Sequence, residues 1–591
     1  MTDAPGLLAH KVRREERADG SILLHAGYDL GPVDLSTGVW LDRWAHATPD
    51  AVFLAERSGA GWRALSYCEV RDQVRALAAG LLARGIDGPI LILSGNSVDH
   101  ALLSLAAHYV GLVTVPVAEQ YSLIPAAHTR LKYIADLVRP GLVYAADDTA
   151  YGAALKLVGC PAVCSIAEQN GATRLADLMR ARGDVDAAHR SVGPDTVAKL
   201  LLTSGSTSDP KAVETTQAMM TANQAQLRDA LPFLETRPPV LVDWLPWNHV
   251  FGGSHNFNLV LANGGTLYID DGKPLPALFH RTVENLGLVS GTISFNVPVG
   301  FAQLAQALEA DGELRQTYFR DLDMIFYAGA SLSQDVWSRL ERMAMDTAGH
   351  MPLITSSWGL TETAPATFLQ HERARGAGIV GVPLPGVTAR LIDDGTGRME
   401  VRVKGPNVFA RYHENPEKTA QSFDDEGFFR TDDAMRFVDP DRPEKGLKFD
   451  GRISENFKLS SGIRVQAARI RLDMLACLGT IAQDVVVCGH DRDSIGVLIV
   501  PGPDARDGAR DDGALICDIA ENIRECMLSA AAGTSGASRR VVRALVLADP
   551  PEIGAGEITA KGNVNFARLL ERRAALVVRL YDDSDPASIV L

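Results

Sequence analysis

The stretch GPILILSGNSVDHALLSLAAHYVGLVTVPV, residues 88–117, decides the expected fold. Its first eight residues have the Ile/Leu content and the flanking turn residues of a buried strand, and residues 98–111 follow as an Ala/Leu-rich helix. A second apolar strand, residues 112–117, comes next. Two strands joined by a helix form a parallel βαβ unit, because a parallel connection must cross back over the sheet. The stretch therefore predicts an α/β fold.

The same alternation continues on both sides of this unit. Apolar runs of strand length recur as GLVYAAD, AKLLLTS, VLVDWLP, GTLYID, LDMIFYAG and PLITSSWG. Between residues 378 and 449 the chain is instead rich in Gly and Pro turns and in strand-like segments. Parallel sheets carry their functional loops at the carboxyl ends of the strands, so we expect the ligand site there.

The region after residue 452 has the pattern of a small α+β unit. Helices are expected near residues 465–478 and 513–531, and strands at residues 482–489, 494–500 and 540–547. The predicted fold class is α/β, with a large N-terminal domain of stacked βαβ sheets plus a β-rich subdomain, residues 1–452. A small α+β C-terminal domain, residues 453–591, follows a hinge near residues 452–455.

The length and charge of the chain exclude several classes of protein. A chain of 591 residues exceeds what one hydrophobic core can hold, so at least two domains are expected. The net charge of −15 argues against a nucleic-acid partner, because phosphate backbones bind to basic surfaces. The apolar stretches are too short for a membrane span and no signal peptide opens the chain, so we expect a cytoplasmic protein.

The seven cysteines are scattered along the chain and include no CxxC pair. Cys160 and Cys164 are the closest two, and no second pair with the spacing of zinc ligands follows them. Disulfides are rare inside cells, so we expect buried, reduced thiols.

A loop rich in small and hydroxyl residues follows the apolar strand 198–202 and reads TSGSTSDPK. Such residues let backbone N–H groups and hydroxyls approach a polyphosphate, and the final lysine adds positive charge. The kinase and ATPase P-loop does not fit, because it needs GxxxxGK[ST] at the start of a helix. A polar surface turn is the plain alternative. The expected phosphate-binding residues are Thr203, Ser204, Gly205, Ser206, Thr207 and Lys211.

This loop resembles the signature TSGSTGxPKG of the adenylate-forming superfamily, which contains acyl-CoA synthetases, peptide-synthetase adenylation domains and luciferases. The resemblance covers nearly the whole chain, although Ser208 and Ala212 stand where the family usually has glycine. It implies that the protein activates a small-molecule carboxylic acid with ATP. It also implies a small C-terminal domain that is mobile and rotates between two half-reactions.

Two downstream motifs fall in the family's order. PWNHVFG resembles the segment in which a histidine, here His249, borders the acyl pocket. The residues Gly329, Ala330 and Ser331 resemble the turn that contacts adenine. A structural histidine and a plain strand-to-helix turn are the alternatives at these two places.

The motif WGLTET resembles the aromatic-GxTE motif of the family. The resemblance implies that Trp358 stacks on adenine next to Gly359, with tryptophan in place of the usual tyrosine. It implies that Thr361 hydrogen-bonds the α-phosphate and that Glu362, with Thr207, holds Mg²⁺. Magnesium is also expected on physical grounds, because a carboxylate that attacks a phosphate must overcome charge repulsion, which a hard cation relieves.

The ribose is expected to be held by two motifs further along the chain. FRTDD resembles the family's RTGD motif, in which an aspartate, here Asp433, binds the ribose hydroxyls. Asp432 stands in place of the usual glycine. Arg452 is the second expected ribose contact. An acidic solvated loop is the alternative for the first motif.

The segment after Arg452 resembles the family's hinge and the start of its second active conformation. By this resemblance Ser454 is the pivot, where the family commonly has Asp or Lys, and Lys458 and Gly462 face the thioester-forming site. In EITAKGN, Lys561 is the candidate for the catalytic lysine that neutralises charge on the α-phosphate. A surface lysine is the alternative.

Several stretches resemble one branch of the family, the feruloyl-CoA synthetases. They include ISFNVPVGF, GLKFDGRISENFKLSSG and GEITAKGNVNFARLL. The resemblance implies a phenylpropenoic acid as the substrate, and aromatic side chains for its pocket are available, although ordinary core packing explains them equally well. The aromatic candidates are Trp244, Trp247, Phe251, Phe257 and Phe295.

The predicted function is therefore that of an ATP-dependent carboxylate–CoA ligase, with ATP and CoA as co-substrates and Mg²⁺ as cofactor. Three alternatives stay open. In the first, the acid is a fatty or benzoic acid. In the second, the acceptor is a thiol or amine other than CoA. In the third, the chain is a catalytically silent nucleotide-binding regulator. No nucleic-acid partner and no membrane span are expected, and a homodimer is one assembly consistent with the family.

Overall fold

The computed structural model describes residues 7–169, 171–204, 210–275, 277–329, 332–374, 376–395, 397–502, 505, 517–531, 539–552, 555–558 and 564–591. The chain folds into two compact units. Unit 1 consists of Met1–Ile392, Arg402–Thr431 and Phe437–Lys448, and unit 2 of Asp393–Val401, Asp432–Arg436 and Phe449–Leu591. None of the helices that the structure describes combines the length and hydropathy that a membrane crossing requires.

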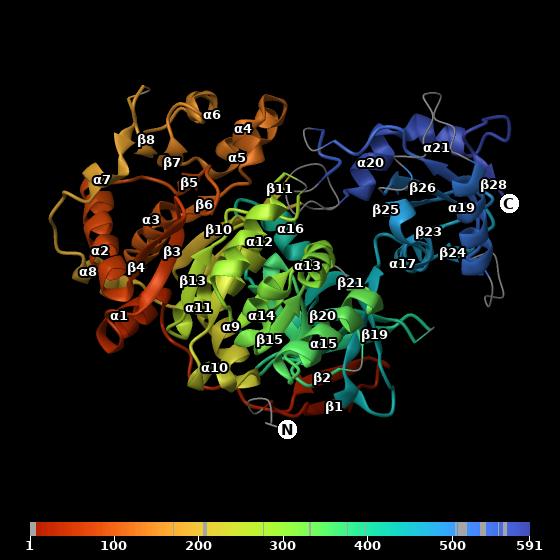
Figure 1. Cartoon of the computed structure of the whole chain (residues 1–591), viewed down its shortest axis with the longest axis horizontal. Helices are drawn as coiled ribbons and strands as arrows, with labels where there is room; N and C mark the ends of the chain where they lie inside the picture. Colours follow the sequence, from red (N-terminus) through yellow and green to blue (C-terminus); the bar gives the residue numbers. More distant parts are fainter. Residues whose placement is uncertain are drawn as a thin grey trace. The chain divides into compact units, whose positions relative to one another are not determined.

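The predicted βαβ unit lies in the middle of one sheet of unit 1. β5 (Ile90–Ile92) is followed by α3 (Val98–Tyr109) and then by β6 (Thr114–Pro116), which pairs with β5 in parallel. The sheet has the order β11-β10-β6-β5-β7-β8-β9 (Figure 1). The other strands are β11 (Pro210–Thr216), β10 (Val197–Ser204), β7 (Leu142–Asp147), β8 (Ala162–Ile166) and β9 (Thr173–Arg174). The α/β prediction is confirmed here.

A second sheet of unit 1 has the order β12-β13-β3-β4. Its strands are β12 (Val240–Asp243), β13 (Thr266–Ile269), β3 (Val52–Ser58) and β4 (Gly61–Ser66). The longer helices of this unit are α1 (Thr37–Ala47), α2 (Tyr67–Arg84), α5 (His128–Val138), α9 (Gln217–Ala230), α12 (Phe279–Leu288), α13 (Pro298–Ala310), α14 (Gly312–Arg320) and α15 (Gln334–Ala348). Shorter ones are α4 (Gln120–Leu123), α6 (Gly152–Val158), α7 (Leu175–Leu178), α8 (Asp186–Ser191), α10 (Phe233–Thr236), α11 (Phe257–Ala262) and α16 (Pro416–Gln421).

The longest sheet has the order β1-β2-β19-β20-β21-β22-β18-β17-β16-β15-β14. One end is parallel, with β14 (Ile293–Asn296), β15 (Met324–Tyr327) and β16 (Leu353–Gly359). β17 (Ala366–Leu369) comes next. The β-rich region predicted between residues 378 and 449 contains β18 (Ile379–Pro383), β19 (Thr388–Asp393), β20 (Met399–Lys404), β21 (Phe429–Phe437) and the start of β22 (Leu447–Arg452). The chain passes between the two units within β19, β20, β21 and β22.

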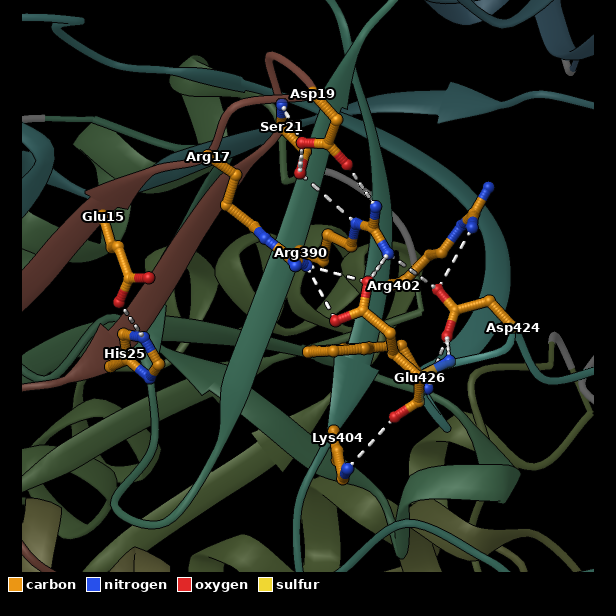
Figure 2. A network of polar contacts seen from close by, with 11 residues as sticks. Glu15, Arg17, Asp19, Ser21, His25, Arg390, Arg402, Lys404, Asp424 and Glu426 are labelled. Atoms are coloured by element: carbon orange, nitrogen blue, oxygen red, sulfur yellow. Dashed lines mark hydrogen bonds and ion pairs between the residues drawn. The ribbon is translucent and has the colours of Figure 1, made fainter.

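The first strands of the chain close the other end of this sheet. β1 (Val12–Glu16) pairs with β2 (Ile22–Ala26), and β2 pairs with β19, beside which it lies in Figure 1. Charged side chains join the same segments, as Figure 2 shows. Arg390 contacts Asp19, Asp424 and Glu426, with its Nη1 atom 2.8 Å from Glu426 Oε1. The network joins the N-terminal hairpin to segments that lie more than 350 residues further along the chain.

Unit 2 contains the α+β region predicted after residue 452, and these element predictions are confirmed. Its main sheet has the order β25-β26-β27-β28, and β23 pairs with β24. The strands are β23 (Phe457–Lys458), β24 (Arg464–Val465), β25 (Ala482–Cys488), β26 (Ile495–Pro501), β27 (Val541–Val546) and β28 (Ile589–Val590). The helices are α17 (Ala467–Leu478), α19 (Cys517–Ala531), α20 (Phe566–Arg572) and α21 (Ala574–Leu580).

The expectation of reduced cysteines is wrong at two positions. Cys477 and Cys526 form a disulfide that joins α17 to α19, with their Cα atoms 5.5 Å apart. That separation lies within the ordinary range for a disulfide. Cys68, Cys160, Cys164 and Cys488 are free. The two helices of the disulfide pack on the same core of unit 2, which includes Ile470, Met474 and Ile523.

Candidate active site

The phosphate loop connects two antiparallel strands. It leaves β10 and returns as β11, so that Thr203 and Lys211 are partners across the pair. Where the described chain resumes after the loop it forms a strand, whereas a kinase-type P-loop leads into a helix. The Thr203 side-chain oxygen is buried and has no hydrogen-bond partner among the described residues, which leaves it free for a ligand. Gly205, Ser206 and Thr207 lie outside the described residues, and Ser204 ends β10.

Lys211 is brought together with Glu362 through Tyr412. The Lys211 Nζ atom lies 4.9 Å from the centre of the Tyr412 ring, and the Tyr412 hydroxyl donates a hydrogen bond to Glu362 Oε1 at 2.8 Å. Burial lowers the pKa of Lys211, and the carboxylate of Glu362 acts in the opposite direction. The three side chains therefore place one positive and one negative charge around a single aromatic ring.

Sequence reasoning missed Tyr412, because it belongs to no motif of the nucleotide site. Its position comes from pairing between distant segments. Val213 on β11 forms a bridge with Tyr412, and the His413 N–H donates to the Ala212 carbonyl at 2.8 Å. Ala212, a departure from the family pattern, is buried in the core beneath this sheet.

Glu362 lies in a tightly held turn that follows β16. The turn, Thr361–Thr363, is buried, and Glu362 is only 9% exposed. The Glu362 carbonyl accepts a hydrogen bond from Phe409 N–H at 2.8 Å, and the Thr363 carbonyl accepts one from Asn407 Nδ2 at 2.7 Å. Backbone and side-chain bonds thus hold the two predicted residues, Thr361 and Glu362, before any ligand binds.

Trp358 and Gly359 end β16 directly before this turn. Trp358 is buried, and its ring lies edge-on to Phe368, with the centroids 5.3 Å apart. Gly359 has no room for a side chain, because a Cβ atom would lie 1.7 Å from the Pro365 carbonyl oxygen. At the other predicted adenine contact, Gly329 follows β15 with φ +87°, and Ala330 and Ser331 lie outside the described residues.

The segment that follows His249 is a buried stretch of π-helix, η2 (Phe251–Asn256). Phe251 N–H donates to His249 Nδ1 at 3.2 Å, so this ring nitrogen acts as an acceptor. A π-helical turn inside a helix is uncommon and is often found at functional sites. The geometry is consistent with a positioned histidine at this place.

The predicted aromatic side chains divide into two groups. Phe251 and Phe295 pack with Phe326 and His255, with ring centroids 5.0 to 5.9 Å apart. Sequence reasoning missed Phe326 and His255. The other three predicted aromatic residues make different contacts. Trp247 and Phe257 pack on each other, Trp247 also on His100 and Phe257 also on Phe53. Trp244 donates a hydrogen bond to Asn296 Oδ1 at 3.2 Å.

Burial lowers the pKa of His255 to about 4, so its ring is neutral at physiological pH. Its Nδ1 atom lies 3.0 Å from Asn256 Oδ1, and Asn256 Nδ2 donates to Asp243 at 2.9 Å. The aromatic group around Phe251 therefore carries no charged side chain of its own.

Unit 2 contains the two predicted ribose contacts and brings them together. Asp433 is buried on β21, and Arg452 Nε lies 3.5 Å from Asp433 Oδ1. The Arg452 side chain is 49% exposed, so its remaining N–H groups are open to solvent. A buried carboxylate beside a half-exposed guanidinium can accept and donate hydrogen bonds to a pair of hydroxyl groups.

The two departures from the family pattern near the hinge contact each other. Asp432 has φ +64°, a left-handed conformation that explains the usual glycine at this position. Its carboxylate accepts hydrogen bonds from the Ser454 N–H at 3.1 Å and from the Ser454 hydroxyl. Its carbonyl accepts from Ile453 N–H at 2.7 Å. The substitutions at positions 432 and 454 therefore form one local structure.

The remaining candidates of unit 2 are exposed. Lys458 lies on β23 with its side chain in solvent, and Gly462 is exposed with φ +81°. Lys561 lies outside the described residues. The structure thus gathers Thr203, Lys211, Trp358, Thr361 and Glu362 in unit 1, and Asp433, Arg452, Lys458 and Gly462 in unit 2.

The described residues contain no group of three or more His, Cys, Asp and Glu side chains that could hold a metal ion. Magnesium bound with a nucleotide needs fewer protein ligands, because the phosphates and water supply the rest. Glu362 fits this pattern, since one of its oxygens accepts from Tyr412 and its carboxylate has further acceptor capacity.

Comparisons with known proteins agree with this geometry. The model of the AMP-binding enzyme family matches residues 41–413, and that of the AMP-binding enzyme C-terminal domain matches residues 457–585. The long-chain-fatty-acid–CoA ligase FadD15 of Mycobacterium bovis is 27% identical over 525 residues, which cover 80% of this chain and 84% of that protein. The malonate–CoA ligase of Arabidopsis thaliana is 28% identical over 346 residues, or 55% of this chain and 54% of that protein.

Among solved structures, ATP-bound MatB from Rhodopseudomonas palustris has the same fold. Its TM-score is 0.70 at 23% sequence identity, and the match covers 92% of this chain and 100% of MatB. The family model alone spans more than half of the chain. The chain therefore belongs to the AMP-binding, adenylate-forming superfamily of enzymes and is an AMP-forming acid–thiol ligase.

Proposed function

We propose that this enzyme joins a carboxylic acid to CoA in two steps on one chain. In the first step, a carboxylate oxygen of the acid attacks the α-phosphorus of ATP, the bond to pyrophosphate breaks, and an acyl-adenylate forms. In the second, the CoA sulfur attacks the acyl carbon, the bond to AMP breaks, and the thiol proton leaves to solvent. The observation that carries the proposal is the Lys211–Tyr412–Glu362 arrangement beside the phosphate loop.

In the first step, Lys211 and Thr203 bind phosphate oxygens, and Thr361 donates to the α-phosphate. Trp358 supplies the flat surface against which adenine packs. Glu362, with Thr207, is the place for Mg²⁺, which when bound offsets the repulsion between the carboxylate and the phosphates. The buried turn around Glu362 keeps these groups oriented without reorganisation when charge develops.

We assign the second step to unit 2. Asp433 and Arg452 bind the ribose, and the domain of residues 453–591 rotates about Ser454 relative to the domain of residues 1–452. Lys561 acts on the α-phosphate in the first step, and Lys458 and Gly462 face CoA in the second. The exposure of Lys458 and Gly462 supports this role, since both are free to meet a second substrate.

The aromatic group around Phe251 favours an apolar acid. Phe251, Phe295 and Phe326 supply apolar rings that pack together, and the Phe251 N–H donates to His249. The neutral His255 offers no partner for a second carboxylate. A dicarboxylic acid such as malonate is therefore disfavoured. FadD15, which matches 80% of the chain, is named for long-chain fatty acids, and a fatty acid is therefore the first candidate. A phenylpropenoic acid such as ferulate is the second.

The test is pyrophosphate release with ATP and Mg²⁺ over a panel of acids, with and without CoA. The panel contains medium- and long-chain fatty acids, ferulate, coumarate, benzoate and malonate. Release that depends on one apolar acid, with its CoA thioester as the product, supports the proposal. Release without a thioester points to another acceptor, and malonate as the only active acid overturns the argument from the aromatic group. If no acid gives release although ATP binds, the chain is a nucleotide-binding regulator.

A further inference from the structure

Lys199 is a fully buried lysine on β10, the strand that leads into the phosphate loop. It is 7% exposed, and no carboxylate of the described residues forms an ion pair with it. Burial alone lowers its pKa to about 8. A buried charge without a counter-charge is costly, so its presence calls for a role.

Among the described residues, the ammonium group of Lys199 has one hydrogen-bond acceptor, which lies in the π-helical segment after His249. Lys199 Nζ donates to the Gly253 carbonyl oxygen at 2.5 Å. Gly253 belongs to the π-helical stretch, and its N–H donates to the His249 carbonyl at 2.9 Å. Two hydrogen bonds thus link the nucleotide strand to the backbone of His249.

The backbone at Gly253, which joins the two hydrogen bonds, is closely packed against Trp247. A Cβ atom on this residue would lie 2.2 Å from the Trp247 carbonyl oxygen, so the backbone of the segment is pressed against Trp247. Trp247 N–H in turn donates to Asn96 Oδ1 at 3.0 Å. Gly253 has no room to move toward the Trp247 carbonyl, so we expect a displacement of Lys199 to reach His249 through the two hydrogen bonds.

The other groups around Lys199 are neutral. Lys199 and Gly253 line a small cavity together with Thr37, His100, His108 and Asn258, among others. Burial lowers the pKa of His100 to about 4 and that of His108 well below its ordinary value, so neither ring competes as a charge. The Thr37 hydroxyl and Asn258 Nδ2 have no hydrogen-bond partner among the described residues. The Gly253 carbonyl is thus the defined anchor of Lys199.

We propose that Lys199 is a positioning residue that couples the nucleotide site to the acid site. When ATP binds beside Thr203 at the end of β10, the strand carries the change through Lys199 to Gly253 and so orients His249 for the acid. The inference rests on the proposed function, because it assumes that these two sites hold ATP and the acid. Coupling of this kind is reciprocal, so the acid strengthens nucleotide binding by the same factor.

The test observes His249 while only the nucleotide is added. Full-length protein labelled with ¹³C at histidine Cε1 is titrated with α,β-methylene ATP and Mg²⁺, and the His249 signal is assigned by its loss in the His249→Gln variant. Wild-type protein and Lys199→Arg, which retains a donor, are expected to show a nucleotide-induced shift of the His249 signal. Lys199→Met is expected to bind the analogue with unchanged affinity and to lose the shift.

A titration of the wild-type protein keeps the inference testable if Lys199→Met does not fold. Raising the pH from 7 to 9 discharges Lys199, whose pKa is about 8, and is expected to reduce the induced shift. The Lys199→Arg variant stays charged and is expected to keep it. An equal shift in Lys199→Met and wild type, or a pH-independent shift, overturns the coupling. Failure of the wild-type protein to bind the analogue overturns the proposed function instead.

Discussion

The candidate residues of unit 1 and those of unit 2 differ in how the chain holds them. Glu362 is 9% exposed, and both its side chain and its carbonyl accept hydrogen bonds from other segments. Arg452 is 49% exposed in its side chain, and Lys458 and Gly462 are exposed as well. The turn of unit 1 is buried and oriented by the fold, whereas the described candidates of unit 2 other than the buried Asp433 lie on the surface of a smaller unit.

The difference indicates which reaction step depends on side chains that the fold orients before the substrates bind. Charge develops on phosphate oxygens in the first step, and groups that are already oriented stabilise it without a cost of reorganisation. A residue that must meet a second substrate has to remain accessible. The comparison therefore predicts that changes to the buried turn of unit 1 reduce adenylate formation directly. Changes to the exposed Lys458 and Gly462 of unit 2 are expected to act on the second step, and changes to the core of unit 2 on its stability.

The largest expected effect is on the stability of unit 2. Replacing both Cys477 and Cys526 by alanine removes a crosslink between residues 49 positions apart, which costs about 4 kcal/mol in the free energy of unfolding of this unit. Hydrogen exchange of α17 and α19 amides in the full chain measures it, with Cys488→Ala, a buried free thiol in the same unit, as the control. Unchanged protection in the double variant and after reduction would contradict the assignment of the disulfide.

The second-largest expected effect concerns Glu362, the buried carboxylate of unit 1. Glu362→Gln keeps the shape of the side chain and an acceptor for Tyr412 but removes the negative charge. We expect acid-dependent exchange of pyrophosphate into ATP to fall about 100- to 1,000-fold, as for the loss of one preorganised electrostatic group. Glu417→Gln, on an exposed glutamate of the same unit, is the control. A Glu362→Gln variant with normal exchange and normal Mg²⁺ dependence would remove Glu362 from the site.

The third effect separates the hydrogen bond of Tyr412 from its ring. Tyr412→Phe removes the donor 2.8 Å from Glu362 and keeps the ring beside Lys211. A hydrogen bond to a charged group contributes about 1.5–3 kcal/mol, so we expect at least about a tenfold loss in the same exchange assay. Tyr412→Leu, which also removes the ring, is expected to lose more. Equal activity of Tyr412→Phe and wild type would show that the fold orients Glu362 without this bond.

The smallest effect concerns the pair of substitutions near the hinge. Asp432→Ala loses the hydrogen bonds to Ser454 and keeps the left-handed backbone, which together cost about 2 kcal/mol of stability in urea unfolding. Asp432→Gly loses the same bonds but relieves the backbone, so a change of less than about 1 kcal/mol is expected. If the glycine variant is destabilised as much as the alanine variant, the hydrogen bonds dominate and the backbone conformation does not.

Sequence patterns predicted the elements that depend on local alternation. Residues 88–117 predict a parallel βαβ unit because strand and helix periods are both visible in one short stretch, and the structure has β5, α3 and β6 there. The β-rich region and the helices and strands of unit 2 follow from the same kind of signal. Such predictions need no knowledge of distant contacts.

Residues whose role depends on distant contacts were missed. Tyr412 meets Glu362 across 50 positions of sequence, and Lys199 meets Gly253 across 54. Neither pair has a spacing that marks it. The Cys477–Cys526 disulfide was missed for the same reason, since its two cysteines carry no CxxC-like pattern. The positive φ of Asp432, by contrast, could be suspected from the glycine that the family pattern has at this position.

The N-terminal hairpin is synthesised long before the strand with which it pairs. Ser21 and Arg390, which hydrogen-bond across the boundary between hairpin and sheet, are 369 residues apart. At ribosomal rates of 5–20 residues per second, the hairpin emerges about 20–70 s before its partner strand exists. During this interval its edges are unpaired. The sequence VRREE of β1 places four charged residues on the outer strand of the hairpin, which disfavours pairing of that edge with other chains both before β19 joins β2 and in the finished sheet, where β1 is the end strand.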